Sequence, residues 1–292
     1  MSLPRLSVSL LRMTIVARQM AAWVAGFICG GAILTASADD QRFVGLKDAS
    51  IQRYELKILG RIPHNPRHFT QGLSFGAGSL WESTGGYGQS KLIRYRWAVS
   101  HDRLDEVDQI ALPAGEFGEG LALLGNMVYQ LTWKEGVVHR YKILAEGLSQ
   151  LSGFKNQRQG WGLTTDGTYL LSSDGSDALY FLSPLDFSLH KAVRVRLAGE
   201  PLTRLNELEW VNGLIWANVW GSSYIVAIHP DDGTVTAVID GRNLVDEVKR
   251  LDDRADVLNG IAWDQASETL LLTGKLWPWI YRVALVEQTA PD

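Results

Sequence analysis

Five residues occupy the same place in five similar stretches of this chain, yet their side chains differ. They are Gln71, Glu119, Trp161, Asn206 and Asn259. A carboxylate can accept and return a proton, amide groups can hold a polar substrate, and an indole can exclude water. The residues that follow them are mostly Gly and then Leu or Ile, so we interpret the repeated positions as framework and the varied ones as a candidate site. The structural alternative is that Glu119 is only a solvated carboxylate and that the amides form hydrogen bonds within the protein rather than with a substrate.

The stretches around these residues are internal repeats. QGL at 71, EGL at 119, WGL at 161, NEL at 206 and NGI at 259 recur at intervals of 42 to 53 residues. Each is followed by a short turn and a second apolar segment, and two of the turns contain Asp166-Gly167 and Asn212-Gly213. Such dipeptides between apolar runs are strong hairpin signals. The spacing leaves room for two further strands in each repeat.

Four strands per period predict an all-β fold, a five-bladed β-propeller. The innermost strand of each blade faces the central channel, so the five varied positions are expected at one mouth of that channel. Residues 54–62 are expected to close the ring by adding a strand to the sheet that contains residues 280–286. Residues 244–251 read as a helix between blades.

Composition excludes several classes of protein. The chain has 292 residues, 46% of them hydrophobic, with a formal net charge of −4 and no Lys/Arg-rich run. It is therefore neither disordered nor fibrous, and no nucleic-acid partner is expected. The repeats run without a linker, so residues 39–292 are predicted to form a single catalytic domain.

The first 38 residues are predicted to be a signal peptide. They contain three arginines and no acidic residue, an apolar stretch at 21–34, and then Ala36-Ser37-Ala38. Cleavage after Ala38 would give a periplasmic or secreted bacterial protein without stable membrane association, and a retained anchor is the less favoured alternative. The only cysteine, Cys29, lies in this segment, so disulfides and a cysteine nucleophile are excluded from the mature chain.

Ten segments, in order along the chain, resemble the plant and bacterial type of glutamine cyclotransferase, a family built on a five-bladed propeller. They include FTQGL at 69–73, ESTGGYGQS at 82–90, FGEGL at 117–121, YQLTWKE at 129–135, GWGLT at 160–164, SDGS at 173–176, LNELE at 205–209, ANVW at 217–220, NGIA at 259–262 and TGKLWP at 273–278. The resemblance covers about residues 54–286 and falls in every repeat.

The resemblance implies that an N-terminal glutamine cyclises to pyroglutamate and releases ammonia. The substrate's own α-amine is the nucleophile, so no enzyme serine or cysteine is required. In this reading Glu119 is the proton shuttle, and Gln71, Asn206 and Lys275 bind the substrate amide or the oxyanion. The structural alternative for Lys275 is an ion pair with Glu207 or Glu209.

The resemblance also implies an aromatic pocket. Its residues are Phe69, Phe117, Trp133, Trp161 and Trp220. Asp174 and Asn259 are weaker site candidates, and Trp277 and Trp279 could form the rim of the pocket. Core packing is expected for the tryptophans at 81, 97, 210, 216 and 263.

No metal or organic cofactor is expected. The six histidines are scattered in the sequence, and Pro63 and Pro66 prevent the helix that would bring His64 and His68 together. A structural calcium ion in the central channel stays open. The expected partners are peptides or proteins with an N-terminal glutamine, acted on by a monomer. Two alternatives remain, a non-enzymatic propeller that binds a partner and a calcium-dependent lactonase-like hydrolase.

Overall fold

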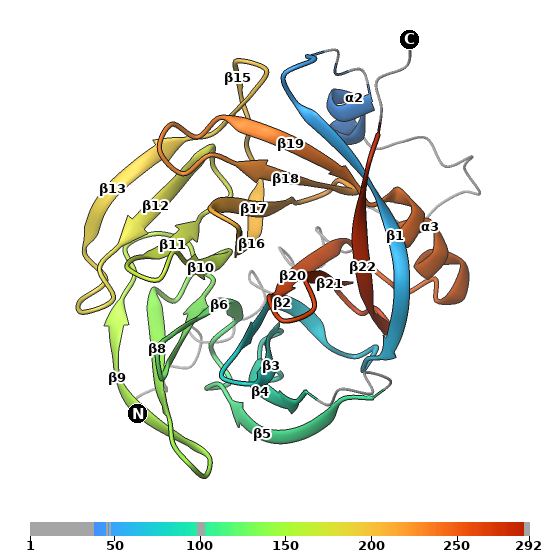
Figure 1. Ribbon diagram of the computed structural model, residues 1–292. Coiled ribbons are helices and arrows are strands. Elements are labelled where there is room, and N and C mark those ends of the chain that lie inside the picture. Colours follow the sequence, from blue (N-terminus) through green and yellow to red (C-terminus); the bar gives the residue numbers. More distant parts are fainter. Residues whose placement is uncertain (1–37, 45, 47, 98–102, 289–292) are drawn as a thin grey trace, which may run out of the picture. The chain divides into compact units, whose positions relative to one another are not determined.

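The chain folds into sheets arranged around a common centre (Figure 1). The computed structural model describes residues 38–44, 46, 48–97 and 103–288, which belong to one unit spanning Ser37–Asp292. The predicted signal peptide, Cys29 included, lies outside the described residues except for Ala38, where helix α2 (Ala38–Val44) begins. No helix among the described residues is long and apolar enough to cross a bilayer.

Three of the sheets have four strands each, paired in sequence order. The first contains β2 (Phe69–Gly76), β3 (Ser79–Gly85), β4 (Lys91–Arg96) and β5 (Asp105–Ala111). The second contains β6 (Gly118–Leu124), β7 (Met127–Thr132), β8 (Val137–Ile143) and β9 (Leu148–Lys155). The third contains β10 (Leu163–Thr165), β11 (Leu170–Ser173), β12 (Ala178–Leu182) and β13 (Leu189–Arg194).

The remaining strands form an eight-stranded sheet and one small hairpin. The large sheet contains β16 (Leu205–Val211), β17 (Leu214–Val219), β18 (Tyr224–Ile228), β19 (Val235–Asp240), β1 (Gln52–Pro63), β22 (Trp279–Glu287), β21 (Thr269–Gly274) and β20 (Leu258–Asp264), in that spatial order. The hairpin is β14 (Arg196–Leu197) with β15 (Glu200–Pro201), which the sequence analysis did not predict. Helix α3 (Arg242–Leu251) lies between β19 and β20, as predicted.

Strand β1 joins the two halves of the large sheet. It pairs antiparallel with β22 and parallel with β19, so that β16–β19 and β20–β22 become one hydrogen-bonded surface. The prediction that residues 54–62 add a strand to the sheet of residues 280–286 is confirmed by this pairing. Both strands are thereby removed from the sheet edge, where unpaired backbone groups would be open to aggregation.

The first strand of each four-strand run lies innermost, and these strands contact one another around the centre (Figure 1). The approach is close because glycines face the neighbouring backbone. A Cβ on Gly72 would lie 2.7 Å from the backbone nitrogen of Leu121, and one on Gly162 would lie 2.0 Å from the carbonyl oxygen of Asn206. The repeated glycines are therefore framework residues, because any side chain would push the strands apart.

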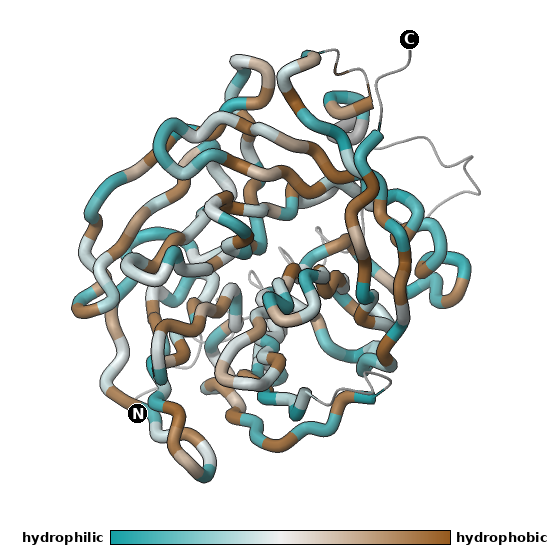
Figure 2. The backbone as a smooth tube through the Cα atoms, in the orientation of Figure 1, coloured by the Kyte–Doolittle hydropathy of each residue, from teal (hydrophilic) through white to brown (hydrophobic). Residues whose placement is uncertain are grey.

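Apolar side chains fill the space between neighbouring sheets. Trp81 and Leu92 of the first sheet pack against Leu121, Val128 and Tyr141 of the second. Each fully buried side chain of this size contributes about 1.5–3 kcal/mol of hydrophobic stabilisation. Figure 2 shows that the strands carry most of the hydrophobic residues and that α3 is mostly hydrophilic on its outer side. The result is a propeller-like all-β fold.

Candidate active site

Four of the five varied repeat positions coincide with β-bulges in the inner strands, whereas Trp161 precedes strand β10. The register of β2 shifts between Thr70 and Gly72, at Gln71, and that of β6 shifts between Gly118 and Leu121, at Glu119. Strands β16 and β20 shift in the same way around Asn206 and Asn259. A bulge inserts an extra residue and re-aims its side chain. The local backbone therefore turns these polar residues out of the regular alternation of the sheet.

Three of these polar residues form a chain of hydrogen bonds. Gln71 Nε2 donates to Glu119 Oε1 at 3.1 Å, and Asn259 Nδ2 donates to Gln71 Oε1 at 3.3 Å. Asn259 Nδ2 also contacts the carbonyl oxygen of Thr70 at 3.0 Å. All three side chains are buried, and Glu119 is only 5% exposed. The structure thus brings together residues from β2, β6 and β20.

Lys275 follows β21 and supplies the positive charge of this group. Its side chain is 4% exposed, and its Nζ lies 4.8 Å from the ring centroid of Phe69. Its backbone is held by hydrogen bonds to Val257 and from Asp256. Glu207 and Glu209 instead accept backbone N–H groups of other inner strands, from Leu73, Ile261 and Trp263, so the alternative ion pair is not observed among the described residues.

Burial and charge set the protonation of Glu119. Removal from water raises the pKa of this carboxyl well above its ordinary value, and the Glu135 carboxylate raises it further, while the Lys275 ammonium lowers it. Burial also lowers the pKa of Lys275, against the attraction of Glu119 and Asp256. A carboxyl with a raised pKa can both accept and return a proton near neutral pH, as general acid–base chemistry requires.

Aromatic rings surround this polar group on one side. The ring of Phe117 lies edge-on to those of Phe69, Trp133 and Tyr87, with centroid distances of 6.1, 5.8 and 5.5 Å. The backbone holds them in place, because Trp133 N donates to Phe117 O at 2.9 Å. Edge-to-face contacts at these distances are favourable and fix ring orientation.

A second pair of indoles, Trp161 and Trp220, lies in the same arrangement, with ring centroids 6.2 Å apart. Gln159 links Trp161 to Trp133, since its Oε1 accepts hydrogen bonds from both indole nitrogens, at 3.3 and 3.0 Å. The carbonyl of Trp161 accepts the N–H of Gly120, the residue after Glu119, at 2.7 Å. The aromatic residues are thereby tied to the bulge that carries the carboxylate.

Two other predicted residues, Asn206 and Asp174, have hydrogen-bond partners outside the chain formed by Gln71, Glu119 and Asn259. Asn206 is buried at the equivalent position of β16, and its backbone oxygen accepts a hydrogen bond from the Ser173 hydroxyl. Asp174 accepts hydrogen bonds from Ser176 and Tyr180, so its carboxylate stabilises a turn.

Sequence reasoning missed the role of Glu135. Its Oε1 accepts the Tyr87 hydroxyl at 2.9 Å and its Oε2 the Phe117 N–H at 3.3 Å. Burial and, to a smaller extent, the Glu135 carboxylate raise the pKa of Tyr87 to about 12. The same carboxylate acts electrostatically on Glu119. The only sequence signal was its place at the end of the 129–135 motif.

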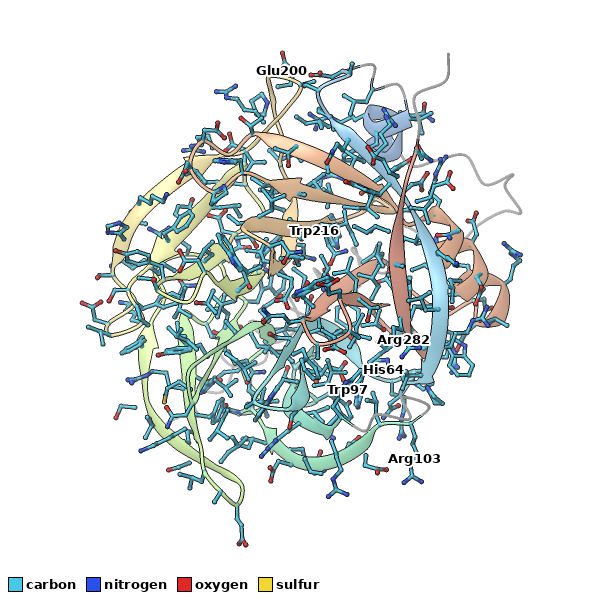
Figure 3. The ribbon with its side chains drawn as sticks, in the orientation of Figure 1. His64, Trp97, Arg103, Glu200, Trp216 and Arg282 are labelled. Atoms are coloured by element: carbon cyan, nitrogen blue, oxygen red, sulfur yellow. The ribbon has the colours of Figure 1, made fainter. Side chains whose placement is uncertain are left out.

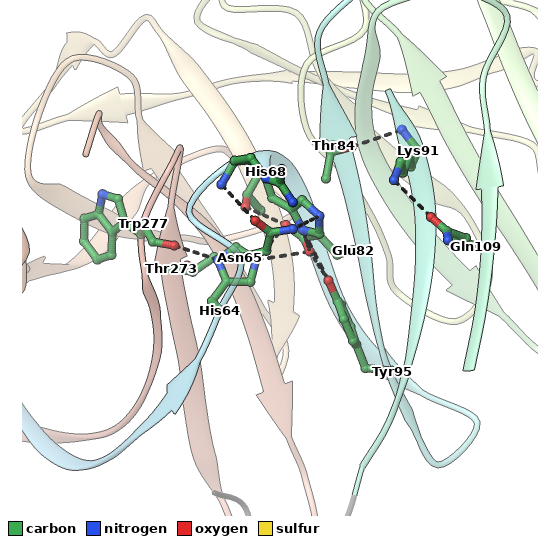
Figure 4. Close-up of polar contacts among 12 residues, drawn as sticks. His64, Asn65, His68, Glu82, Thr84, Lys91, Tyr95, Gln109, Thr273 and Trp277 are labelled. Atoms are coloured by element: carbon green, nitrogen blue, oxygen red, sulfur yellow. Dashed lines mark hydrogen bonds and ion pairs between the residues drawn. The ribbon is translucent and has the colours of Figure 1, made fainter. Parts of the chain in front are cut away.

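Two expectations from the sequence are wrong. Trp277 does not form a rim: it is fully buried, and its indole N–H donates to the carbonyl of Asp256. The histidines are not all scattered either: no helix forms at His64, which Figure 3 labels, but the chain reverses in a turn, and the rings of His64 and His68 lie 5.4 Å apart beside Glu82 (Figure 4).

A separate cavity of about 550 Å³ lies at the opposite ends of the inner strands, where β2, β10 and β16 finish. Glu209, Trp210 and Trp263 are among its lining residues, and it contains none of the candidate site residues named above. This cavity is therefore distinct from the polar group around Glu119.

Comparison with known proteins agrees with this geometry. The family model described as glutamine cyclotransferase matches residues 28–285. The glutaminyl-peptide cyclotransferase of Arabidopsis thaliana is 38% identical over 247 residues, which cover 83% of this chain and 75% of that protein. The crystal structure of Myxococcus xanthus glutaminyl cyclase matches with a TM-score of 0.75 and 37% identity, covering 82% of this chain and 100% of that one.

Proposed function

The chain belongs to the glutamine cyclotransferase family, and from this premise we propose that its inner-strand bulges carry the reaction, with Glu119 as the proton shuttle. It is a glutaminyl-peptide cyclotransferase. The α-amine of an N-terminal glutamine attacks the carbon of its own side-chain amide. A ring C–N bond forms, the amide C–N bond breaks, and ammonia leaves.

One carboxylate can carry both proton transfers of this reaction. Glu119 accepts the proton that the attacking amine loses and returns it to the departing amide nitrogen, so the enzyme ends the cycle unchanged. The observation that supports this role is the buried Gln71–Glu119 hydrogen bond next to the Lys275 ammonium. Gln71, Lys275 and Asn206 are assigned to hold the substrate amide and the oxyanion, because donors already fixed by the fold need no reorganisation during the reaction.

The aromatic rings form the substrate pocket in this proposal. Phe69, Phe117, Trp133, Trp161 and Trp220 would exclude water and hold the glutamine side chain folded back on its own amine. Peptide and protein substrates follow from the cyclase activity. The reaction as written requires no metal, since the nucleophile comes from the substrate.

Three wider features belong to the same proposal. Five inner strands, starting near 71, 119, 161, 206 and 259, support a five-bladed propeller made by one domain. The apolar segment and the Ala-Ser-Ala sequence support cleavage near Ala38 and export to the periplasm or medium. Strand β1 pairs within the chain on both sides, with β19 and with β22, so it offers no free edge to a second copy, which supports a monomer.

The test is ammonia release from a short peptide that begins with glutamine, followed together with the mass of the product, using the full-length protein after dialysis against chelator. Release of one ammonia per cyclised peptide is expected. A folded protein that releases none would favour the partner-binding alternative, and activity restored only by calcium would overturn the metal-independent mechanism.

A further inference from the structure

A buried carboxylate on β3 binds four donors close to the proposed active site. Glu82 is 0% exposed. The hydroxyls of Thr70 and Tyr95 donate to its two oxygens, each at 2.7 Å. His64 Nε2 lies 3.1 Å from Oε1, and His68 Nδ1 lies 3.0 Å from Oε2 (Figure 4). Each oxygen therefore receives two donors, and the charge is satisfied although it is removed from water.

The hydrogen-bond partners define which ring nitrogens of the two histidines act as donors. His64 Nδ1 lies 2.9 Å from the carbonyl oxygen of Trp277, which can only accept. Its Nε2 faces the carboxylate, so both ring nitrogens carry a proton and His64 is an imidazolium. His68 Nε2 accepts from Asn65 Nδ2 at 3.1 Å, and its Nδ1 faces the carboxylate as the donor.

The pair is electrostatically consistent. Burial alone would lower the pKa of His64, but the Glu82 carboxylate outweighs burial and raises it. Burial alone would raise the pKa of Glu82, and the His64 charge and hydrogen bond instead lower it well below the ordinary value. Each charged group thus stabilises the charged form of the other.

The same histidines hold the segment that carries Lys275. His64 N donates to Pro278 O at 2.9 Å, and Leu276 N donates to His68 O at 2.8 Å. Leu276 has φ of +61°, a left-handed conformation that costs a residue with a side chain energy and persists only when its surroundings impose it. The turn directly after Lys275 is therefore fixed from outside, by the segment that Glu82 anchors.

The hydrogen-bond network around Glu82 also extends to the side-chain amides of Asn259 and Gln71. Thr70 donates its hydroxyl to Glu82, and its carbonyl oxygen accepts Asn259 Nδ2, which in turn donates to Gln71. Glu82 thus lies at the junction of two segments, one leading to Gln71 and the other to Lys275. None of the residues around Glu82 is among those assigned to contact the substrate.

We propose that the buried Glu82–His64 ion pair is a positioning element that holds Lys275 and Gln71 against Glu119, a role that rests on the proposed function. Loss of the Glu82 charge leaves the His64 imidazolium buried without a partner. The turn at Leu276 then loses its anchor and Lys275 moves relative to Glu119. Displacements of about 1 Å in such groups cost up to about a hundredfold in rate.

A metal ion is the competing occupant of this cluster. The ligand-type atoms of His64, His68 and Glu82 all lie within 4.8 Å of one another. The hydrogen bonds favour the ion pair, because hydroxyl donors already occupy both carboxylate oxygens and Asn65 uses the second nitrogen of His68. The metal is therefore an outcome of the test rather than part of the proposal.

The test compares Glu82→Gln with a matched control, Glu209→Gln. Burial raises the pKa of Glu209 to about 8, so its carboxyl is largely protonated at neutral pH, and glutamine replaces it with the same shape and charge. We expect Glu82→Gln to lower kcat about 10- to 100-fold, and Glu209→Gln to stay within about twofold of the wild type.

The pH profile separates positioning from mere packing. The Lys275 ammonium lowers the pKa of Glu119, while burial, Glu135 and the nearby Tyr87 hydroxyl are unchanged by the substitution. When Lys275, which also faces Asp256, is displaced, its ammonium lowers the pKa of Glu119 less than in the wild type. The acid limb of kcat/KM should therefore move to higher pH in Glu82→Gln, which a purely structural role would not cause.

Each outcome has one meaning. Glu82→Gln that folds with wild-type kcat and an unmoved acid limb overturns the positioning role. Should it fail to fold, Tyr95→Phe, which removes one donor, takes its place, with an expected loss of about three- to tenfold and the same direction of shift; no change there overturns the role as well. One equivalent of Zn²⁺ bound by the full-length protein and lost in His68→Ala overturns the ion-pair assignment. A wild type and a Glu209→Gln variant that both release no ammonia reject the proposed function itself.

Discussion

The position of the Phe117 ring can be tested without altering any residue that touches the substrate. Gly85 ends β3 directly against this ring: a Cβ at Gly85 would lie 2.2 Å from Phe117 Cε1 and 2.6 Å from Cζ. Ordinary contact begins at 3.4 Å, so Gly85→Ala requires the ring to retreat by about 1 Å. The backbone of Phe117 is held on both sides, by Glu135 and by Trp133, so the ring rather than the chain must move.

The displaced ring has little free space. Phe69, Tyr87 and Trp133 all contact it edge-on, so the shift spreads through the pocket wall. We expect kcat/KM to fall about 10- to 100-fold and the free energy of unfolding to fall by about 1–3 kcal/mol, the usual cost of overpacking.

The assay is steady-state ammonia release from a glutamine-initiated peptide, with urea unfolding in parallel. Gly115→Ala is the matched control, since a Cβ there has no neighbour within 4 Å although the residue lies only two positions from Phe117. It should behave as the wild type. A folded Gly85→Ala enzyme with kcat/KM within threefold of the wild type would refute the claim that this wall must be rigid.

Three further substitutions test separate parts of the site. Glu119→Gln keeps the hydrogen-bonding shape but cannot move a proton, so kcat should fall about 10²- to 10⁴-fold with unfolding unchanged; normal turnover would remove Glu119 from the mechanism. Trp161→Ala should raise KM about tenfold, because the indole that forms part of the pocket wall is lost. Unchanged kinetics would mean that Trp161 has only a structural role. Glu135→Gln removes a negative charge that raises the pKa of Glu119, so the acid limb of kcat/KM should move to lower pH, and an unmoved limb would contradict the coupling.

Local patterns predicted the framework of the fold well, because its physical causes are local. Glycines at 72, 120 and 162 repeat since backbone must meet backbone there, whereas a Cβ on Gly260 would meet the side chains of Thr273 and Thr70. The apolar segments on either side of the turns repeat since each forms a hairpin. The closing strand and the helix, which spans 242–251 in the structure, were predicted from segments that lie outside the repeats.

The features that sequence could not supply depend on backbone geometry or on distant partners. No pattern marks Leu276 as a left-handed residue, yet the turn it forms directs Trp277 inward to the carbonyl of Asp256 instead of out to a rim. The pairing of His64 with His68 requires Glu82 from another strand. The bulges at Gln71 and Glu119 likewise emerge only when two strands are placed side by side.

The role of β1 as the closing strand has a consequence for how the protein folds. Its antiparallel partner β22 lies more than 200 residues further along the chain. A growing polypeptide can form the intervening sheets one hairpin at a time, but β1 has neither sheet partner until β19, and then β22, have been made. Contacts across such a sequence distance are reached slowly, because a long loop must close before they form. Once made, the closure joins strands from near both ends of the chain, and β1 cannot leave the sheet without breaking its hydrogen bonds to both β19 and β22.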